Sequence, residues 1–376
     1  MKTEDEAIEI QMATKVIRAG MTPVKQGSAF STGVIFASPY YAAGEVADSP
    51  YTYGRYHNPT WTQFELALGE LENGRALTFA SGMAAVAAVF GTILRPGDTL
   101  LMASDCYYTA RLLADGFFTE MGIEVKKAPA ASREFEEMIN GAKLVWIESP
   151  TNPNLDVADI SQLVKTARKA GAVVAVDNTT ATILAQSPLS LGADFSVASD
   201  SKALTGHSDL ILGHVAVQNE NLATALLKWR TQMGGIPAPM EVWLAHRSLA
   251  TLEVRFERQC RNAQLIAEYL LRRDESMNVR YPGLPNDPSH ATASKQMRYF
   301  GQVIAFELKD RGQAERFLAA CRLITEATSF GGIHSTAERR ARWGGDAIGE
   351  GFIRLSVGCE DARDLIGDMA QALDKI

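Results

Sequence analysis

Three short apolar runs, each ending on a polar residue, constrain the fold of this chain more than any other feature. They are LVWIE (Leu144–Glu148), VVAVD (Val173–Asp177) and DFSVAS (residues 194–199). A stretch with helical periodicity, Ile160–Ala170, separates the first two runs. Strands that alternate with helices in this way are typical of βαβ units and a mostly parallel sheet. The sequence therefore predicts an α/β protein.

The length and the change of pattern along the chain predict more than one domain. The chain has 376 residues, and residues 1–48 combine weak periodicity with several glycine and proline breakers. We interpret that segment as an N-terminal arm, followed by a sheet domain over residues 49–240. Long helices such as 252–272 and a mixed α/β tail then predict a smaller C-terminal domain over residues 241–376.

Charge and cysteine usage argue against several other classes of protein. With 37 basic and 44 acidic side chains, no nucleic-acid or membrane-surface partner is expected. The most apolar stretch, residues 83–94, is shorter than the roughly 20 residues of a membrane span. The N-terminus is acidic, unlike a secretory signal. The four cysteines are far apart and lack zinc spacing, so we expect a reduced, cytoplasmic chain without a metal site.

Candidate site residues follow the predicted strands, because ligands of parallel sheets bind beyond the carboxyl ends of the strands. Lys202 lies there in the segment ASDSKALTGHSD. A partly desolvated lysine can bond to a carbonyl cofactor, whereas an ordinary lysine would extend to solvent. Asp177 could pair with a protonated pyridine nitrogen, and Tyr107 could stack on a flat ring. The amides after Ser81 could bind a phosphate at a helix N-terminus.

Each of these residues also has an ordinary structural interpretation. Asp177 could cap a helix, Gly82 could form a turn, and Tyr107 could be part of the core. The nucleotide-binding signatures GxGxxG and GxxxxGK[ST] are absent, which disfavours a nicotinamide oxidoreductase. A catalytically silent homologue of an enzyme is a further alternative. The order of the four features along the chain favours a pyridoxal-phosphate site.

Six segments together resemble the Cys/Met-metabolism family of pyridoxal-phosphate enzymes. They are SGMAA, YGRYHNPT, IESPTNP, VVAVDN, SDSKALTGHSD and IRLSVGCED. The family includes cystathionine γ-lyase, methionine γ-lyase and cystathionine γ-synthase, and the resemblance runs from about Thr14 to the C-terminus. It implies the fold-type I, aminotransferase-like architecture, with a large mostly parallel sheet domain and a smaller C-terminal α/β domain. It also implies pyridoxal 5'-phosphate as the cofactor.

The resemblance assigns a role to each matching position. Lys202 matches the lysine that bonds to the cofactor and moves protons, Asp177 the partner of the ring nitrogen, and Tyr107 the stacking tyrosine that protonates departing sulfur. Acid–base work near neutral pH requires lowered pKa values for such groups. The positions that match phosphate ligands are Gly82, Met83, Ser199 and Ser201.

Other matches concern the substrate and neighbouring subunits. Arg354 matches the arginine that binds the substrate carboxylate, a task that suits a bidentate guanidinium. Ser329 and Asn152 match pocket residues. Tyr53 and Arg55 match residues that reach the phosphate from a neighbouring subunit. This implies shared active sites and a homo-oligomer, by resemblance a tetramer built as a dimer of dimers.

Several positions depart from the family pattern, and they concern the choice of substrate. Family members that use cystathionine often carry charged side chains where this chain has Thr52, Leu112 and Thr328. A small apolar thioether tail fits that loss, which favours γ-elimination of L-methionine. L-Cystathionine and γ-replacement remain alternatives, because methionine γ-lyases carry a cysteine where this chain has Thr109.

The family segment HPA…MTH is also replaced, here by GGIHSTAERRARWGGDAIGEG. Residues 339–343 contain three arginines, but the net charge of -7 disfavours a nucleic-acid patch. We expect this segment to form a loop over the mouth of the active site. Either Trp343 or His334 is then expected to lie near the substrate.

Overall fold

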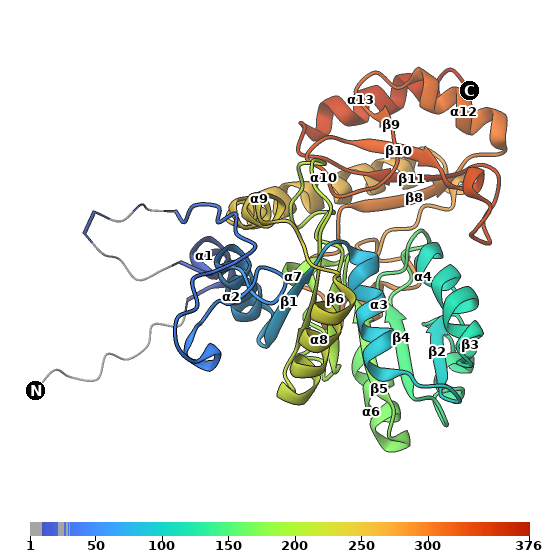
Figure 1. Cartoon of the computed structure of the whole chain (residues 1–376). Coiled ribbons are helices and arrows are strands. Elements are labelled where there is room, and N and C mark those ends of the chain that lie inside the picture. Colours follow the sequence, from blue (N-terminus) through green and yellow to red (C-terminus); the bar gives the residue numbers. More distant parts are fainter. Residues whose placement is uncertain (1–9, 22–25, 28, 30) are drawn as a thin grey trace, which may run out of the picture.

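Two β-sheets organise the part of the chain that the structure describes (Figure 1). The structure is a computed structural model that describes residues 10–21, 26–27, 29 and 31–376. Part of the expected N-terminal arm therefore lies outside the described residues. Within the arm, α1 (Met12–Arg18) packs against α2 (Pro59–Glu72) and α10 (Leu252–Arg273).

The large sheet has seven strands in the order β1-β7-β6-β5-β4-β2-β3. Their bounds are β1 (Arg75–Phe79), β2 (Thr99–Ala103), β3 (Glu124–Ala128), β4 (Leu144–Glu148), β5 (Val173–Asp177), β6 (Phe195–Ala198) and β7 (Gly213–Val217). The strands from β3 to β6 pair in parallel, whereas β7 runs antiparallel to β6 and to β1. The predicted α/β class and mostly parallel sheet are confirmed. Strands β1 and β7 were not predicted, because five-residue runs beside glycine resemble turns.

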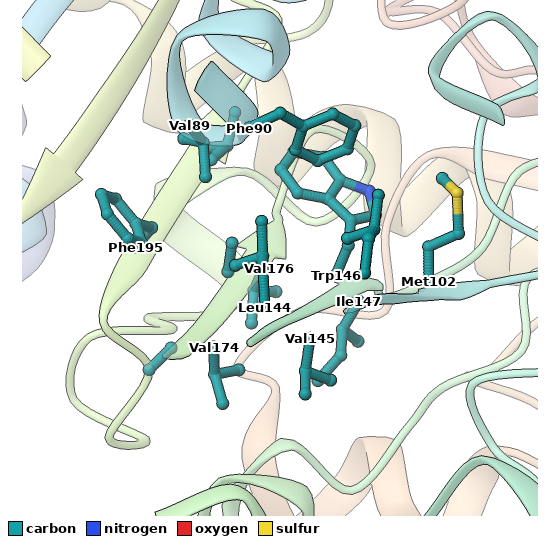
Figure 2. Packing of buried hydrophobic residues seen from close by; sticks show 14 of the residues in the cluster. Val89, Phe90, Met102, Leu144, Val145, Trp146, Ile147, Val174, Val176 and Phe195 are labelled. Carbon is teal, nitrogen blue, oxygen red and sulfur yellow. The ribbon is translucent and has the colours of Figure 1, made fainter. Parts of the chain in front are cut away.

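Helices cover both faces of this sheet, and its central strands β4, β5 and β6 are buried except for the first residue of β5. The helices between the strands are α3 (Gly82–Ile93), α4 (Tyr108–Leu113), α5 (Arg133–Glu137), α6 (Ile160–Ala170), α7 (Thr182–Ala185) and, after β7, α8 (Glu220–Met233). Figure 2 shows the core, in which the Trp146 ring of β4 lies edge-on to Phe90 of α3 at 5.0 Å. Strands buried on both faces are nearly all apolar, which is why β4 and β5 were recognisable.

Local signals set the ends of the predicted helices. At α6, the Asp159 side chain accepts a hydrogen bond from the Gln162 amide, and Gly171 ends the helix with φ +72°. Helix α4 continues directly into a wider π-helical turn, Ala114–Phe118. Such a turn depends on tertiary packing and leaves no periodic signal.

The small sheet has four strands in the order β8-β11-β10-β9. Its strands are β8 (Val303–Glu307), β9 (Thr325–Glu326), β10 (Thr336–Arg339) and β11 (Phe352–Ser356). Helices α12 (Arg311–Ala320) and α13 (Ala362–Leu373) pack beside it, as Figure 1 shows, together with α10. Helix α9 (Pro239–Leu249) packs against α2, and α11 (His290–Gln296) precedes β8. The boundaries at residues 48 and 240 remain predictions.

The described residues show neither a membrane-spanning helix nor a metal-binding cluster. In that part of the chain no helix has both the length and the apolar character needed to cross a membrane. The same residues contain no cluster of three or more histidine, cysteine or acidic side chains that could hold a metal ion. The four cysteine thiols are free, with Cys106 and Cys260 buried.

Candidate active site

A cavity of about 520 Å³ opens where the carboxyl ends of β4, β5 and β6 face the small sheet. The expected residues that line it are Gly82, Met83, Tyr107, Asn152, Asp177, Ser199, Ser201, Lys202, Ser329 and Arg354. The cavity has two sides. We call the residues that follow strands of the large sheet, from Ser81 to Lys202, the inner wall. Residues 328–354, from the small sheet and its connections, form the outer wall.

The N-terminus of α3 builds one end of the inner wall. The Ser81 hydroxyl accepts a hydrogen bond from the Ala84 amide at 3.0 Å and so caps the helix. A Cβ atom on Gly82 would lie 2.6 Å from Cβ of Ser199, so only glycine lets these two segments approach. Ser201 lies beside them, with its hydroxyl held by the Leu212 amide at 2.9 Å. Free amides at a helix N-terminus beside two serines suit a phosphate group.

Two acidic side chains end adjacent strands of the inner wall, because Glu148 pairs with Asp177 in the β4–β5 register. The Asp177 carboxylate accepts hydrogen bonds from the Thr179 amide at 3.0 Å and from its hydroxyl at 2.6 Å. Burial raises the pKa of the Asp177 carboxyl, although the two Thr179 hydrogen bonds and Lys202 oppose the shift. The Asp177 side chain is thus oriented into the cavity, where a pyridine nitrogen could meet it.

Glu148 was placed at the strand end from the sequence but was given no role. Its carboxyl accepts a hydrogen bond from the Tyr107 amide at 2.6 Å, so it positions the residue expected to stack on the cofactor. Burial, together with the charge of Asp177, raises the pKa of Glu148 well above its usual range.

Lys202 follows β6 in a turn and reaches across the cavity to the outer wall. Its Nζ donates a hydrogen bond to the Ser329 hydroxyl at 2.9 Å and lies 5.5 Å from the centre of the Phe330 ring. Burial lowers the pKa of Lys202, and the positive charge of Arg354 lowers it further. The lowered pKa expected for an acid–base lysine is thus found.

A buried ion cluster lies beneath this turn and was missed from the sequence. His214 of β7 lies between two carboxylates, with Nδ1 2.6 Å from Asp200 and Nε2 3.2 Å from Glu72. Burial alone would lower the pKa of His214, but the two carboxylates raise it to about 10. Asp200 stands between Ser199 and Ser201, so this cluster anchors the segment that carries Lys202.

Arg354 of β11 forms the floor of the outer wall and is 4% exposed. Its guanidinium donates to Asn152 Oδ1 at 2.6 Å and to the Ser329 carbonyl at 3.0 Å, and it pairs with Glu338. Burial lowers the pKa of Arg354 to about 10. Ser329 has φ +74°, a left-handed backbone that is uncommon for serine and typical of functional loops. The arrangement can bind a carboxylate beside Lys202.

Tyr53 and Arg55 do not line this cavity. Arg55 Nη1 donates to the Thr231 carbonyl at 2.9 Å, and its guanidinium lies 5.0 Å from the Tyr56 ring. Tyr53 is largely exposed. The two residues are thus separate from the site within one chain.

The outer wall contains Glu338 and Arg340, which were not predicted as site residues, beside Trp343 and Thr328, which the sequence analysis connected with the substrate. Glu338, Arg340 and Trp343 line the cavity, as does Thr328, whereas His334 does not. The expectation of a loop was wrong for residues 336–339, which pair into the small sheet as β10. The turn that follows, Arg340–Trp343, reaches the cavity, and of the two residues suggested there Trp343 lines it. Departure from the family segment was the only signal in the sequence for these positions.

The cavity as a whole fits a flat, phosphate-bearing pyridine cofactor. The close approach at Gly82 leaves room for a phosphate, Asp177 provides an acceptor, and Lys202 provides an amine. Tyr107 provides an aromatic ring on the same wall. These are the groups with which proteins bind and tune pyridoxal phosphate.

Known proteins match the chain over almost its whole length. A family model described as "Cys/Met metabolism PLP-dependent enzyme" matches residues 11–374. The chain is 52% identical over 368 residues to a Streptomyces coelicolor protein named "Putative cystathionine gamma-lyase", covering 96% of this chain and 93% of that one. It is 37% identical over 369 residues to L-methionine gamma-lyase of Pseudomonas putida, covering 93% and 92% of the two chains.

Solved structures agree. Cystathionine gamma synthase from Xanthomonas oryzae pv. oryzae, in complex with aminoacrylate and cysteine, superposes with a TM-score of 0.93 at 32% identity and covers 98% of each chain. Relatives named as lyases and as a synthase thus match over similar lengths. The chain belongs to the Cys/Met-metabolism family of pyridoxal-phosphate-dependent enzymes.

Proposed function

We propose that this enzyme is a carbon–sulfur lyase that removes the γ-substituent of a sulfur amino acid. L-Methionine is the first-choice substrate, with 2-oxobutanoate, ammonia and methanethiol as products. The observation that supports this choice most is the neutral hydroxyl of Thr328 on the outer wall. Family members that act on cystathionine often carry a glutamate at this position, so a charged distal end of the substrate would lack that partner here.

The proposed roles follow from the contacts of each side chain. Arg354 binds the α-carboxylate of the substrate, because Asn152 and Glu338 hold its guanidinium in the cavity. Bound pyridoxal phosphate supplies an electron sink that stabilises negative charge on substrate carbon atoms. Lys202 Nζ removes the proton from Cα and then acts at Cβ; its lowered pKa increases the share of free amine at neutral pH. The Tyr107 hydroxyl protonates the departing sulfur.

Cofactor binding is assigned to the inner wall. The amides of Gly82 and Met83 and the hydroxyls of Ser199 and Ser201 are proposed to hold the phosphate. Asp177 is proposed to hold the ring nitrogen, and Tyr107 to stack on the ring. Lys202 is proposed to bond to the cofactor aldehyde. All of these residues line the cavity.

We place Tyr53 and Arg55 in the active site of a neighbouring subunit and propose a homotetramer built as a dimer of dimers. The position of both residues outside the cavity of their own chain supports this. Arg55→Ala and Lys202→Ala should each be inactive alone. Co-expressed, they should regain activity, since a mixed dimer has one site with both residues intact. A monomeric native mass, or no regained activity, would contradict shared sites.

A parallel assay tests the reaction. The cofactor-loaded enzyme is given L-methionine or L-cystathionine, and 2-oxobutanoate and the released thiol are both measured. We expect equimolar keto acid and methanethiol from methionine, and little product from cystathionine. If neither substrate yields keto acid, the lyase proposal fails.

Two other activities have specific support. L-Cystathionine as substrate is favoured by the Streptomyces coelicolor relative at 52% identity. γ-Replacement is favoured by the similarity to the Xanthomonas oryzae synthase. A preference for cystathionine in the parallel assay would establish the first. Product formed only from an O-acylhomoserine and a thiol would establish the second.

A further inference from the structure

The turn that follows β10 gives the outer wall an aromatic side chain. A 3₁₀ turn, Arg340–Trp343, connects β10 to the loop that leads to β11. Trp343 lines the cavity and is 52% exposed, so part of its indole is not covered by the rest of the chain. A large half-exposed aromatic at the mouth of an active site offers contact area to a bound molecule.

One buried carboxylate connects this indole to the substrate-binding arginine. Glu338 is 1% exposed and lies directly opposite Arg354 in the β10–β11 register. One of its oxygens accepts from Arg354, and the other accepts from Nε1 of Trp343 at 2.9 Å. The guanidinium and the indole are therefore each one hydrogen bond from the same carboxyl group. If the α-carboxylate of a substrate binds Arg354, the rest of that substrate lies close to the indole of Trp343.

The cations around the indole already have carboxylate partners. Arg340 donates to Glu338 at 3.2 Å and to Asp346 at 2.7 Å. Arg342 donates to Glu326 at 2.9 Å and lies 5.4 Å from the centre of the Trp343 ring. Both arginine charges are thus already neutralised, and of their buried nitrogen atoms only Nε of Arg340 has no hydrogen-bond partner among the described residues. A carboxylate at the far end of a substrate would therefore meet no unpaired cation here.

The next layer holds this turn in place. Asp346 also binds Arg111 at 2.7 Å, and Arg111 donates to the Gly345 carbonyl at 2.9 Å. A Cβ atom on Gly345 would lie 2.4 Å from the Tyr108 ring, so the loop rests directly on α4. The indole is thus presented by a rigid support and needs no rearrangement to meet a ligand.

From these contacts we propose that Trp343 determines substrate specificity, its indole packing against the tail of an uncharged thioether. This inference rests on the proposed function, since it assumes a sulfur amino acid held by Arg354. Thioether sulfur makes favourable contacts with aromatic rings, and an apolar tail gains by leaving water. Such a contact favours substrates with neutral tails, such as methionine, over substrates whose tails end in a charged amino-acid head.

Steady-state kinetics provide the first test. Trp343→Ala should raise KM for L-methionine roughly tenfold, since a methylthio group loses most of one apolar contact face. Trp343→Phe should restore most of the affinity. Phe117→Ala, which removes an aromatic of similar exposure outside the cavity, should leave KM unchanged. Equal KM values for wild type and Trp343→Ala would overturn the proposal.

Binding without turnover separates this inference from the proposed function. L-Norleucine has the shape of methionine but no leaving group. Titrated into the cofactor-loaded enzyme, it should change the tryptophan fluorescence of the wild type and not that of Trp343→Phe, while both show the change in cofactor absorbance. If methionine is not cleaved but the fluorescence change depends on Trp343, the proposed lyase function is wrong and the proposed contact between Trp343 and the substrate tail is supported. If methionine is cleaved and the two proteins give the same fluorescence change, the contact fails.

Discussion

The two walls of the cavity are built in different ways. The inner wall takes its side chains from residues at or shortly after the ends of strands of the large sheet, such as Asp177 at the end of β5 and Lys202 after β6. The outer wall depends on ion pairs that involve residues distant from those strands in sequence, such as Asp346 with Arg340. Topology fixes the first wall, and side-chain pairing fixes the second. The inner wall therefore suits a cofactor that all members of the family share. The outer wall suits a substrate that differs from one member to another.

The largest effect on activity is expected from replacing Lys202 of the inner wall. Lys202→Ala removes the amine that we propose acts at Cα and Cβ, so we expect turnover to fall roughly 10⁴-fold or below detection, together with the visible absorbance of the bound cofactor. Lys228→Ala, at an exposed position of α8, is the matched control and should behave as wild type. Substantial turnover by Lys202→Ala would show that Lys202 is not required for the reaction.

A second test concerns the support beneath the inner wall, the Glu72–His214–Asp200 cluster. Because the pKa of His214 is about 10 in the folded chain and 6.5 ordinarily, its charge stabilises the fold fully below pH 6.5. That stabilisation is lost as the pH rises through 10. Removing one partner of a buried ion pair costs about 3–5 kcal/mol, so His214→Gln should melt well below wild type at pH 7.

Thermal melts between pH 6 and 10.5 measure this effect. The wild type should lose stability toward the alkaline end, and His214→Gln should show a flatter profile. His334→Gln, an exposed histidine outside the cavity, is the control. Parallel profiles for wild type and His214→Gln would mean that the histidine is not charged in the fold.

The outer wall should respond in substrate affinity rather than in cofactor binding. Arg354→Lys keeps the charge but loses the fork that Asn152 and Glu338 hold, so KM should rise roughly 10- to 100-fold, as for the loss of a charge-assisted hydrogen bond. Arg363→Lys, a largely exposed arginine paired with Asp361, is the matched control. A large loss of cofactor affinity in Arg354→Lys would contradict the division between the walls.

The smallest effect is expected at Glu148, and it sharpens the account of the inner wall. Burial raises the pKa of Glu148, which favours its uncharged form, and the amide oxygen of a glutamine could accept the hydrogen bond of the Tyr107 amide in its place. Glu148→Gln should keep kcat/KM within about threefold of wild type. Glu148→Ala, which removes the acceptor for the Tyr107 amide, should lose more. A severe defect in the glutamine variant would show that the charged form is needed.

How much the sequence could predict follows the same division. The strands at Leu144–Glu148 and Val173–Asp177 were recognisable because buried parallel strands are continuous apolar runs, and the residues after them could be placed at one edge. The cluster around His214 was not, since residues 72, 200 and 214 meet only when β7 returns antiparallel to β6. The contact of Glu338 with Arg354 depends in the same way on the β10–β11 register. Pairings over such sequence distances have no local pattern.

The antiparallel pairing of β10 with β11 has a consequence for how this enzyme could diversify. Because register fixes Glu338 opposite Arg354, the carboxylate-binding end stays in place whatever joins the two strands. The connecting residues 340–351 form one continuous insert that begins and ends at neighbouring points of the small sheet. Evolution or design could therefore replace this insert without moving Arg354. The enzyme would then keep its cofactor chemistry and accept amino-acid substrates with different side chains.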